Sequence, residues 1–264
     1  MRTLVSLLTV VVFSFVACSN SNDQDADSGQ LSGDCSLKII NGEECPKGEG
    51  PIALVVAESE DGIPLSMCSG TFITTKKILS AAHCGQLMDA PVTKVYTGNT
   101  VVKVSSFKAH PYYVNNAPYN FRYDVGIFTL EDSINISPLP LLLSRQPQVG
   151  DLIFVYGFGI DENNQTAIDN DWGNSVRRTS MLVSSLQNGG IVAEFDATHS
   201  GACEGDSGGP ALAQSPQGSY GITGVVSGGT NDSCQVGTLE VFTEIAQDEV
   251  LNFILSEVPN VDAV

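Results

Sequence analysis

Short runs of β-branched and aromatic residues, separated by turn residues, recur along this chain from about residue 38 onward. Five of them have the length of a strand and are bounded by Gly, Asn, Asp or Pro; they lie at residues 52–57, 92–96, 125–130, 152–157 and 220–226. Such side chains favour strands, and regular punctuation by turn residues is typical of a β-sandwich or a β-barrel. The helix-strand alternation that a parallel sheet needs is not visible. The pattern therefore predicts an all-β fold.

One helical pattern stands near the C-terminus, where apolar residues recur at helical spacing over residues 245–255. Between residues 137 and 150, the strand pattern is interrupted by Pro138, Pro140 and Pro147. Proline has no backbone N–H and cannot continue the hydrogen bonding of a sheet. We therefore expect two β-subdomains of similar size that meet near this segment, followed by a C-terminal helix.

Composition excludes two classes of protein. Of the 264 residues, 42% are hydrophobic and only 16% are charged, which is too apolar for a mostly disordered chain. With 30 acidic and 12 basic residues, the formal net charge is -18. A field of this sign repels phosphate backbones, so we expect no nucleic-acid partner.

Residues 1–17 resemble a secretory signal peptide. Arg2 precedes an apolar run at residues 4–17, and this run is shorter than the roughly 20 residues that a spanning helix needs. A buried core helix is the alternative, but the run is crowded with Val and Phe, which are weak helix formers. The segment predicts an exported protein.

The sequence Val-Ala-Cys at residues 16–18 resembles a bacterial lipobox, in which the cysteine carries the lipid. The segment that follows, residues 19–29, is polar and acidic and cannot bury enough apolar surface to fold. We interpret residues 18–38 as an acidic tether and pro-segment, with acyl chains on Cys18 holding the protein at a bacterial cell surface. An ordinary cleaved signal, with Cys18 discarded and the protein extracellular, stays open as the alternative.

The string Cys-Glu-Gly-Asp-Ser-Gly-Gly-Pro at residues 203–210 contains a candidate nucleophile, Ser207. A serine hydroxyl is a weak nucleophile unless a base takes its proton, and the glycines leave Ser207 exposed. The backbone N–H groups of Gly205 and Ser207 are candidates to bind the oxyanion of a tetrahedral intermediate. His83, which lies among small residues in Ser-Ala-Ala-His-Cys, is the candidate base. A Gly-rich turn without function is the alternative.

These motifs resemble those of the trypsin-like (chymotrypsin-family) serine peptidases. Residues 81–84, 124–127 and 205–210 are similar to the family's histidine, aspartate and serine motifs, and they stand in the family's order. The resemblance extends from Ile39 to the C-terminal helix.

The resemblance implies an all-β peptidase domain at residues 39–264, made of two antiparallel six-stranded β-barrels with the active site between them. The barrels are expected at about residues 39–145 and 146–243, with a C-terminal helix at about 244–256. We expect a monomer that needs neither a cofactor nor a metal ion.

The same resemblance implies roles for the candidate residues. Ser207 attacks the acyl carbon, His83 acts as general base and then as general acid, and Asp124 orients the imidazole. The protein is then a serine endopeptidase with protein or peptide substrates. A catalytically inactive binding protein on the same scaffold is the alternative, because a fold alone does not confer activity.

Family resemblance also implies a zymogen. Cleavage after Lys38 would free the α-ammonium of Ile39 to enter the fold and pair with Asp206, a buried carboxylate that is costly without a cation. The activating protease is another enzyme or the protein itself, if it cleaves after lysine.

The chain has seven cysteines. The resemblance implies two disulfide bridges, Cys68–Cys84 and Cys203–Cys234. By elimination, Cys35 pairs with Cys45 across the cleavage site, so the pro-segment stays attached after activation. The remaining Cys18 is the lipid site.

The sequence departs from the family at the positions that determine substrate specificity. Gly201 stands where the family's aspartate selects Lys or Arg, whereas Glu240 stands at a pocket-lining position usually held by Gly. Ser227 and Gly229 are assigned to substrate binding. A carboxylate on this wall pairs with a basic side chain if it enters the pocket. If Glu240 instead points to solvent, the pocket takes a large apolar side chain.

Overall fold

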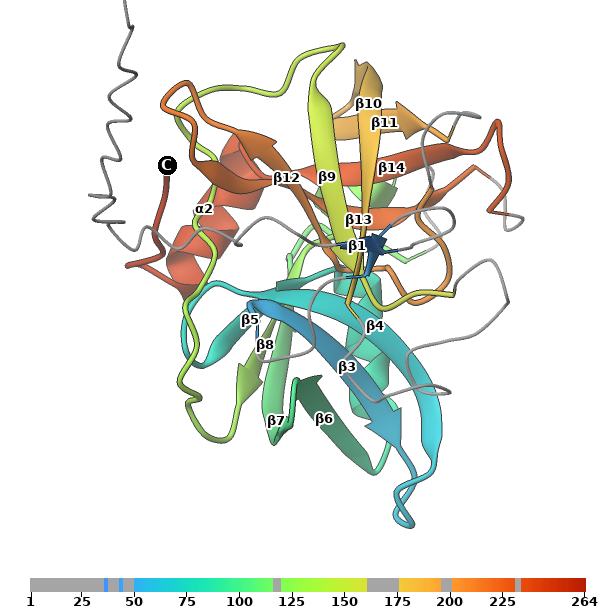
Figure 1. Ribbon diagram of the computed structural model, residues 1–264. Helices are drawn as coiled ribbons and strands as arrows, with labels where there is room; N and C mark the ends of the chain where they lie inside the picture. Colours follow the sequence, from blue (N-terminus) through green and yellow to red (C-terminus); the bar gives the residue numbers. More distant parts are fainter. Residues whose placement is uncertain are drawn as a thin grey trace, which may run out of the picture.

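The computed structural model describes residues 50–115, 120–160, 176–195, 201–230 and 234–264, together with the backbone of residues 36–37 and 43–44. The described chain forms two closed, six-stranded antiparallel barrels and a short C-terminal helix (Figure 1). The predicted fold class is therefore confirmed. The two barrels lie one above the other in Figure 1, with the N-terminal barrel below.

The first barrel is closed in the order β3-β4-β5-β8-β7-β6. Its strands are β3 (Ile52–Glu58), β4 (Pro64–Phe72), β5 (Lys77–Ser80), β6 (Val92–Thr97), β7 (Thr100–Ala109) and β8 (Gly126–Leu130). Strand β3 is buried along its whole length, which explains its continuous apolar run. Strands β6 and β7 are joined by a two-residue turn in which Gly98 has a φ of 53°, a conformation that glycine adopts without strain.

The second barrel is closed in the order β10-β11-β14-β13-β12-β9. Its strands are β9 (Leu152–Gly157), β10 (Arg177–Gln187), β11 (Gly190–Glu194), β12 (Pro210–Gln214), β13 (Tyr220–Gly229) and β14 (Leu239–Glu244). Phe195, Phe242 and Met181 are among the residues that fill its core. On β14, Glu240 and Phe242 are both buried because alternate residues of a strand share a face.

The C-terminal helix α2 (Asp248–Glu257) begins three residues later than the apolar pattern predicts. The sheet holds the intervening residues, since the backbone N–H of Ile245 donates to the carbonyl of Thr223 at 3.0 Å. Gln247, which directly precedes the helix, donates from its side-chain amide to the carbonyl of Gly189 at 2.6 Å. None of the helices in the described part of the chain is long and apolar enough to cross a membrane.

Two short strands that the sequence did not predict precede the barrels. Strand β1 (Ser36–Leu37) pairs antiparallel with β2 (Glu43–Glu44), and both lie beside β10. Their pairing brings together the backbone on either side of the predicted cleavage site at Lys38.

Candidate active site

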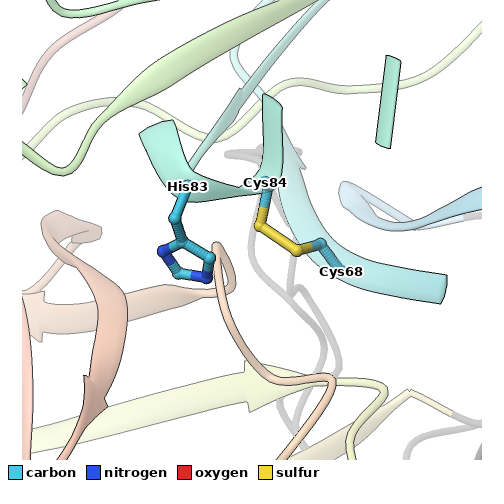
Figure 2. A group of neighbouring side chains, drawn as sticks. All are labelled: Cys68, His83 and Cys84. Atoms are coloured by element: carbon cyan, nitrogen blue, oxygen red, sulfur yellow. A yellow bond between two sulfur atoms is a disulfide. The ribbon is translucent and has the colours of Figure 1, made fainter. Parts of the chain in front are cut away.

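His83 lies in the short 3-10 helix η1 (Ala82–Asp89), which follows strand β5. The next residue, Cys84, is joined to Cys68 of β4 by a disulfide with a Cα–Cα distance of 6.2 Å, so the turn that carries His83 is tied to the barrel (Figure 2). The two sulfur atoms lie close to the imidazole. Because they are bonded to each other, they are not thiolates that would bind a metal ion with His83.

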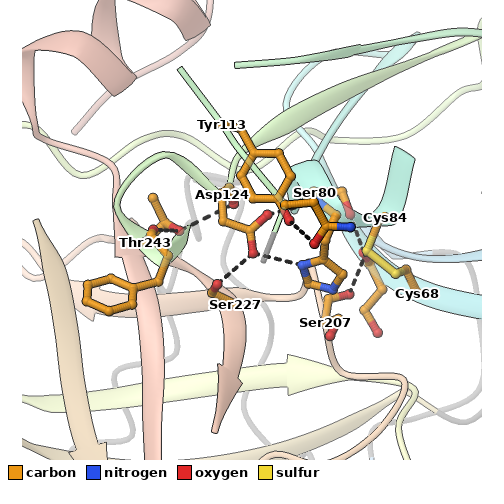
Figure 3. Close-up of polar contacts among 12 residues, drawn as sticks. Cys68, Ser80, Cys84, Tyr113, Asp124, Ser207, Ser227 and Thr243 are labelled. Carbon is orange, nitrogen blue, oxygen red and sulfur yellow. Dashed lines mark hydrogen bonds and ion pairs between the residues drawn. A yellow bond between two sulfur atoms is a disulfide. The ribbon is translucent and has the colours of Figure 1, made fainter. Parts of the chain in front are cut away.

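Asp124 binds the imidazole of His83. Its carboxylate is 1% exposed and accepts hydrogen bonds from the backbone N–H of His83 at 2.9 Å and from its Nδ1 at 2.7 Å. The hydroxyl of Ser227, on β13, donates to the same carboxylate at 2.6 Å (Figure 3). With Nδ1 facing Asp124, the Nε2 atom of the ring is the one left for a reacting group.

Ser207 is brought to His83 by backbone contacts between the two barrels. Its carbonyl accepts a hydrogen bond from the N–H of Ser69 at 2.8 Å and lies 3.7 Å from the sulfur of Cys84, the neighbour of His83. Figure 3 shows Ser207 in the same cluster as Asp124. In the described residues, no hydrogen bond joins the Ser207 hydroxyl to the imidazole; such bonds are often formed only with substrate bound.

Two glycines around Ser207 have backbone conformations that other residues rarely adopt. Gly205 has a φ of 93° and Gly208 a φ of 84°. A Cβ on Gly208 would lie 2.0 Å from the hydroxyl of Ser80 and 2.3 Å from the carbonyl of Ser69. The glycines of the motif are therefore required both by conformation and by the close approach of the first barrel.

Ser69, which sequence reasoning missed, connects the barrels at this point. Its hydroxyl donates to the carbonyl of Gly205 at 2.8 Å and accepts from the N–H of Phe158 at 2.9 Å. Its N–H donates to the carbonyl of Ser207, so two hydrogen bonds from Ser69 hold the segment of residues 203–209 that carries Ser207, and the third joins Ser69 to Phe158. The only signal in the sequence is a small polar residue directly after Cys68.

Asp206 is fully buried against Gly157 and Gly159. A Cβ added to either glycine would lie within 2.4 Å of a carboxylate oxygen, so both must be glycine for Asp206 to fit. The carboxylate accepts hydrogen bonds from the N–H of Gly159 at 2.8 Å and of Cys203 at 2.9 Å. Burial nevertheless raises the pKa of Asp206 from 3.8 to about 6.

Arg177 is a second residue that sequence reasoning missed. It is 4% exposed at the start of β10, paired with Gly157 of β9, and its guanidinium donates to the carbonyl of Gly159. The positive charge lowers the pKa of Asp206, but by less than burial raises it. Nothing in the local sequence distinguishes this arginine from a surface residue of a strand.

The predicted substrate-binding residues gather at one end of the second barrel. Glu240 on β14 is paired with Gly229 on β13, two residues beyond Ser227. Gly201 is buried, and a Cβ there would lie 2.6 Å from the ring of Phe195. Glu240 is 4% exposed; burial, followed by the charge of Asp206, raises its pKa from 4.5 to about 8.

A second disulfide, Cys203–Cys234, with a Cα–Cα distance of 5.5 Å, closes the loop that follows β13 onto the loop of Ser207. The remaining predicted positions lie outside the described residues: Cys18, Cys35, Lys38, Ile39 and Cys45. Lipidation, the third disulfide and the cleavage site therefore stay predictions.

Several proteases are similar to this chain in sequence. Chymotrypsin-like elastase family member 1 of Macaca fascicularis is 25% identical over 91% of this chain and 95% of its own length. Chymotrypsin-2 of Vespa crabro is 25% identical over 78% of this chain and 94% of its own. Serine protease Hayan of Drosophila melanogaster is 25% identical over 80% of this chain, which spans 38% of that longer protein.

A solved structure of neuropsin, a serine protease expressed in the limbic system of mouse brain, covers 83% of this chain and 99% of its own with a TM-score of 0.65. At 21% identity this likeness supports the fold alone. The family model for trypsin matches residues 39–254, which includes both barrels and most of the C-terminal helix. The chain belongs to the trypsin family.

Proposed function

We propose that this protein is an exported serine endopeptidase that hydrolyses peptide bonds through Ser207, His83 and Asp124. The observation that carries the proposal is the carboxylate of Asp124, which binds both the imidazole of His83 and the hydroxyl of Ser227. It joins residues from both barrels at the point where the Ser207 loop meets the first barrel. Serine protease relatives of similar length support protein or peptide substrates.

In the proposed reaction, Ser207 Oγ forms a bond to the carbonyl carbon of the substrate while its proton passes to Nε2 of His83. The N–H groups of Gly205 and Ser207 stabilise the oxyanion. His83 then gives the proton to the departing amine as the C–N bond breaks. Water, activated by the same imidazole, hydrolyses the acyl-enzyme and restores Ser207.

A diverse peptide mixture, incubated with activated protein and analysed by mass spectrometry, tests the proposal. We expect cleavage by the wild-type protein and none by Ser207→Ala, which keeps the fold. An inactive binding protein on the same scaffold would give no Ser207-dependent cleavage and no labelling of Ser207 by a fluorophosphonate probe. That pair of results would overturn the proposed function.

We also propose that the protein is made as a zymogen and is activated by cleavage after Lys38, performed by another protease or by the protein itself. The support is that Asp206 is fully buried and that burial raises its pKa to about 6 despite two backbone donors and Arg177, so an added positive charge would stabilise the ionised carboxylate. The α-ammonium of Ile39 would supply that charge.

Lys38→Gln tests the activation step. We expect this variant to fold, to resist cleavage and to lack activity, whereas the wild-type protein gains activity as Ile39 becomes its N-terminus. Full activity of the uncleaved variant would contradict the zymogen proposal while leaving the endopeptidase proposal intact.

Export is supported by the two disulfides at Cys68–Cys84 and Cys203–Cys234, because such bonds persist in oxidising compartments. Lipid attachment at Cys18 would hold the protein at a bacterial cell surface. Metabolic labelling with a fatty acid, compared between the wild type and Cys18→Ser, tests it: loss of label supports attachment at Cys18, and an unlabelled wild-type protein refutes it.

A further inference from the structure

Glu240 is a buried carboxylate that has no bonding partner among the described residues. It is 4% exposed, on the inner face of β14 that it shares with the core residue Phe242. Within the described ranges, no side chain or backbone group forms a hydrogen bond or an ion pair with its carboxylate. A buried carboxylate without a partner destabilises the fold, so a purely structural role does not explain why an acid is present here.

The carboxylate of Glu240 still has an opening to solvent. Among the described residues, Ser215 Oγ is the one fully enclosed side-chain oxygen or nitrogen without a hydrogen bond. The unbonded oxygens of Glu240 are thus not fully enclosed. On the neighbouring strand, Glu240 faces Gly229, which has no side chain to cover it.

This opening lies near the nucleophile. Asp206, directly before Ser207, is close enough to Glu240 for their charges to interact. Arg177, the cation that acts on Asp206, is engaged with the carbonyl of Gly159. On β13, Gly229 opposite Glu240 stands two residues from Ser227, which binds the catalytic aspartate. A side chain that enters the opening therefore has its backbone within reach of Ser207.

We propose that Glu240 is the specificity-determining residue of the active site and that it binds the ammonium or guanidinium group of a substrate lysine or arginine. The inference rests on the proposed peptidase function and names its substrate class. The basic residue is the one whose carbonyl carbon Ser207 attacks. Its cation supplies the partner that the carboxylate lacks, and the pair is strengthened because water is largely excluded.

A large apolar side chain fits these observations less well. It would remove the remaining water from the carboxylate of Glu240 without giving it a partner. The other position for an acid, residue 201, is a glycine against the ring of Phe195, so Glu240 is the acid that is available to the substrate.

Two reporter peptides that differ only in lysine or norleucine before the scissile bond provide the test. Norleucine matches the lysine stem and lacks the charge, so the ratio of the two kcat/KM values isolates recognition of the cation. The ratio is measured at pH 9, where Glu240 is ionised and lysine remains protonated. We expect Glu240→Gln to lower it by about 10- to 100-fold, as for loss of a hydrogen bond between charged groups.

Glu194→Gln is the matched control. Glu194 lies on β11 next to the residue that pairs with Glu240, but its side chain is exposed, so the ratio should not change. An unchanged ratio in Glu240→Gln, or a wild-type preference for norleucine, would overturn the assignment. Cleavage of the norleucine peptide by Glu240→Gln shows that the variant is folded and active.

A binding measurement separates this inference from the proposed function. Calorimetry of the Ser207→Ala protein with n-butylammonium, which mimics a lysine side chain, requires no turnover. We expect binding that Glu240→Gln weakens by at least about 10-fold. Binding without peptide cleavage by the wild type would refute the peptidase and retain the cation site, whereas cleavage without such binding would refute the cation site alone.

Discussion

Replacing Glu240 by glutamine should stabilise the folded protein, and the gain should grow as the pH rises. The pKa of Glu240 is raised from 4.5 in the unfolded chain to about 8 in the fold. Between these values the folded state holds a proton that the unfolded state has released. Wild-type stability therefore falls with rising pH over this range, and glutamine, which does not titrate, removes that fall.

The magnitude follows from the two pKa values. Folding raises the pKa of Glu240 from 4.5 to about 8. At about 1.4 kcal/mol per pH unit, burying the ionised carboxylate lowers the free energy of unfolding by on the order of 5 kcal/mol. Burying the glutamine amide adds a contribution that does not depend on pH. The test is therefore how the stability difference between Glu240→Gln and the wild type depends on pH. This difference should rise from pH 5 to pH 8 and level off above pH 8.

Urea denaturation at fixed ionic strength, between pH 5 and pH 9, measures the difference. Both proteins carry Ser207→Ala to prevent autolysis. Burial of Asp206 lowers stability with rising pH in both proteins, so the difference between them reports the burial of Glu240 together with its charge interaction with Asp206. Glu194→Gln should give a flat difference because that side chain is exposed. A flat or falling difference for Glu240→Gln would refute the reasoning that its carboxylate is buried without a partner.

Three further variants, the first with a control outside the site, provide further tests. Gly208→Ala should lower stability by at least about 3 kcal/mol in thermal unfolding, because the position combines positive φ with a close backbone contact; Gly150→Ala, with a φ of 90° and open space, should cost about 1 kcal/mol. Ser227→Ala removes a donor to the carboxylate that orients the imidazole and should lower kcat about 10-fold with KM little changed. Arg177→Met should raise the pKa of Asp206 further, which extends the pH-dependent loss of stability above pH 6; an unchanged pH profile would contradict a role for this arginine.

Local patterns predicted much of the fold. The apolar runs at 52–57, 152–157 and 220–226 correspond to β3, β9 and β13. Strand β3 is buried on both faces, and a run of that kind needs no long-range information to be recognised. Closure into barrels is different, since it depends on pairing between distant strands such as β3 with β6. The family resemblance predicted the two barrels but not which of their strands pair.

In the candidate site, too, local sequence patterns predicted some residues, whereas the roles of others depend on the fold. His83 and Ser207 are marked by their neighbours in sequence, but the hydrogen bond from His83 to Asp124 spans 41 positions and follows from the fold. Ser69 and Arg177 were missed because their roles arise from contacts with the loop of Ser207 and with Gly159, which no local pattern encodes. Functional residues that act through backbone atoms of other segments leave little trace in a single sequence.

Asp206 and Glu240 together link activation to specificity in the proposed mechanism. Burial is the main cause of both raised pKa values, and the charge of Asp206 adds to the raised pKa of Glu240. A cation that neutralises one carboxylate weakens the repulsion felt by the other. The α-ammonium of Ile39 should therefore make Glu240 easier to ionise and strengthen the binding of a basic side chain. Because coupling between two binding events is reciprocal, a bound lysine side chain should in turn favour insertion of the new N-terminus at Asp206.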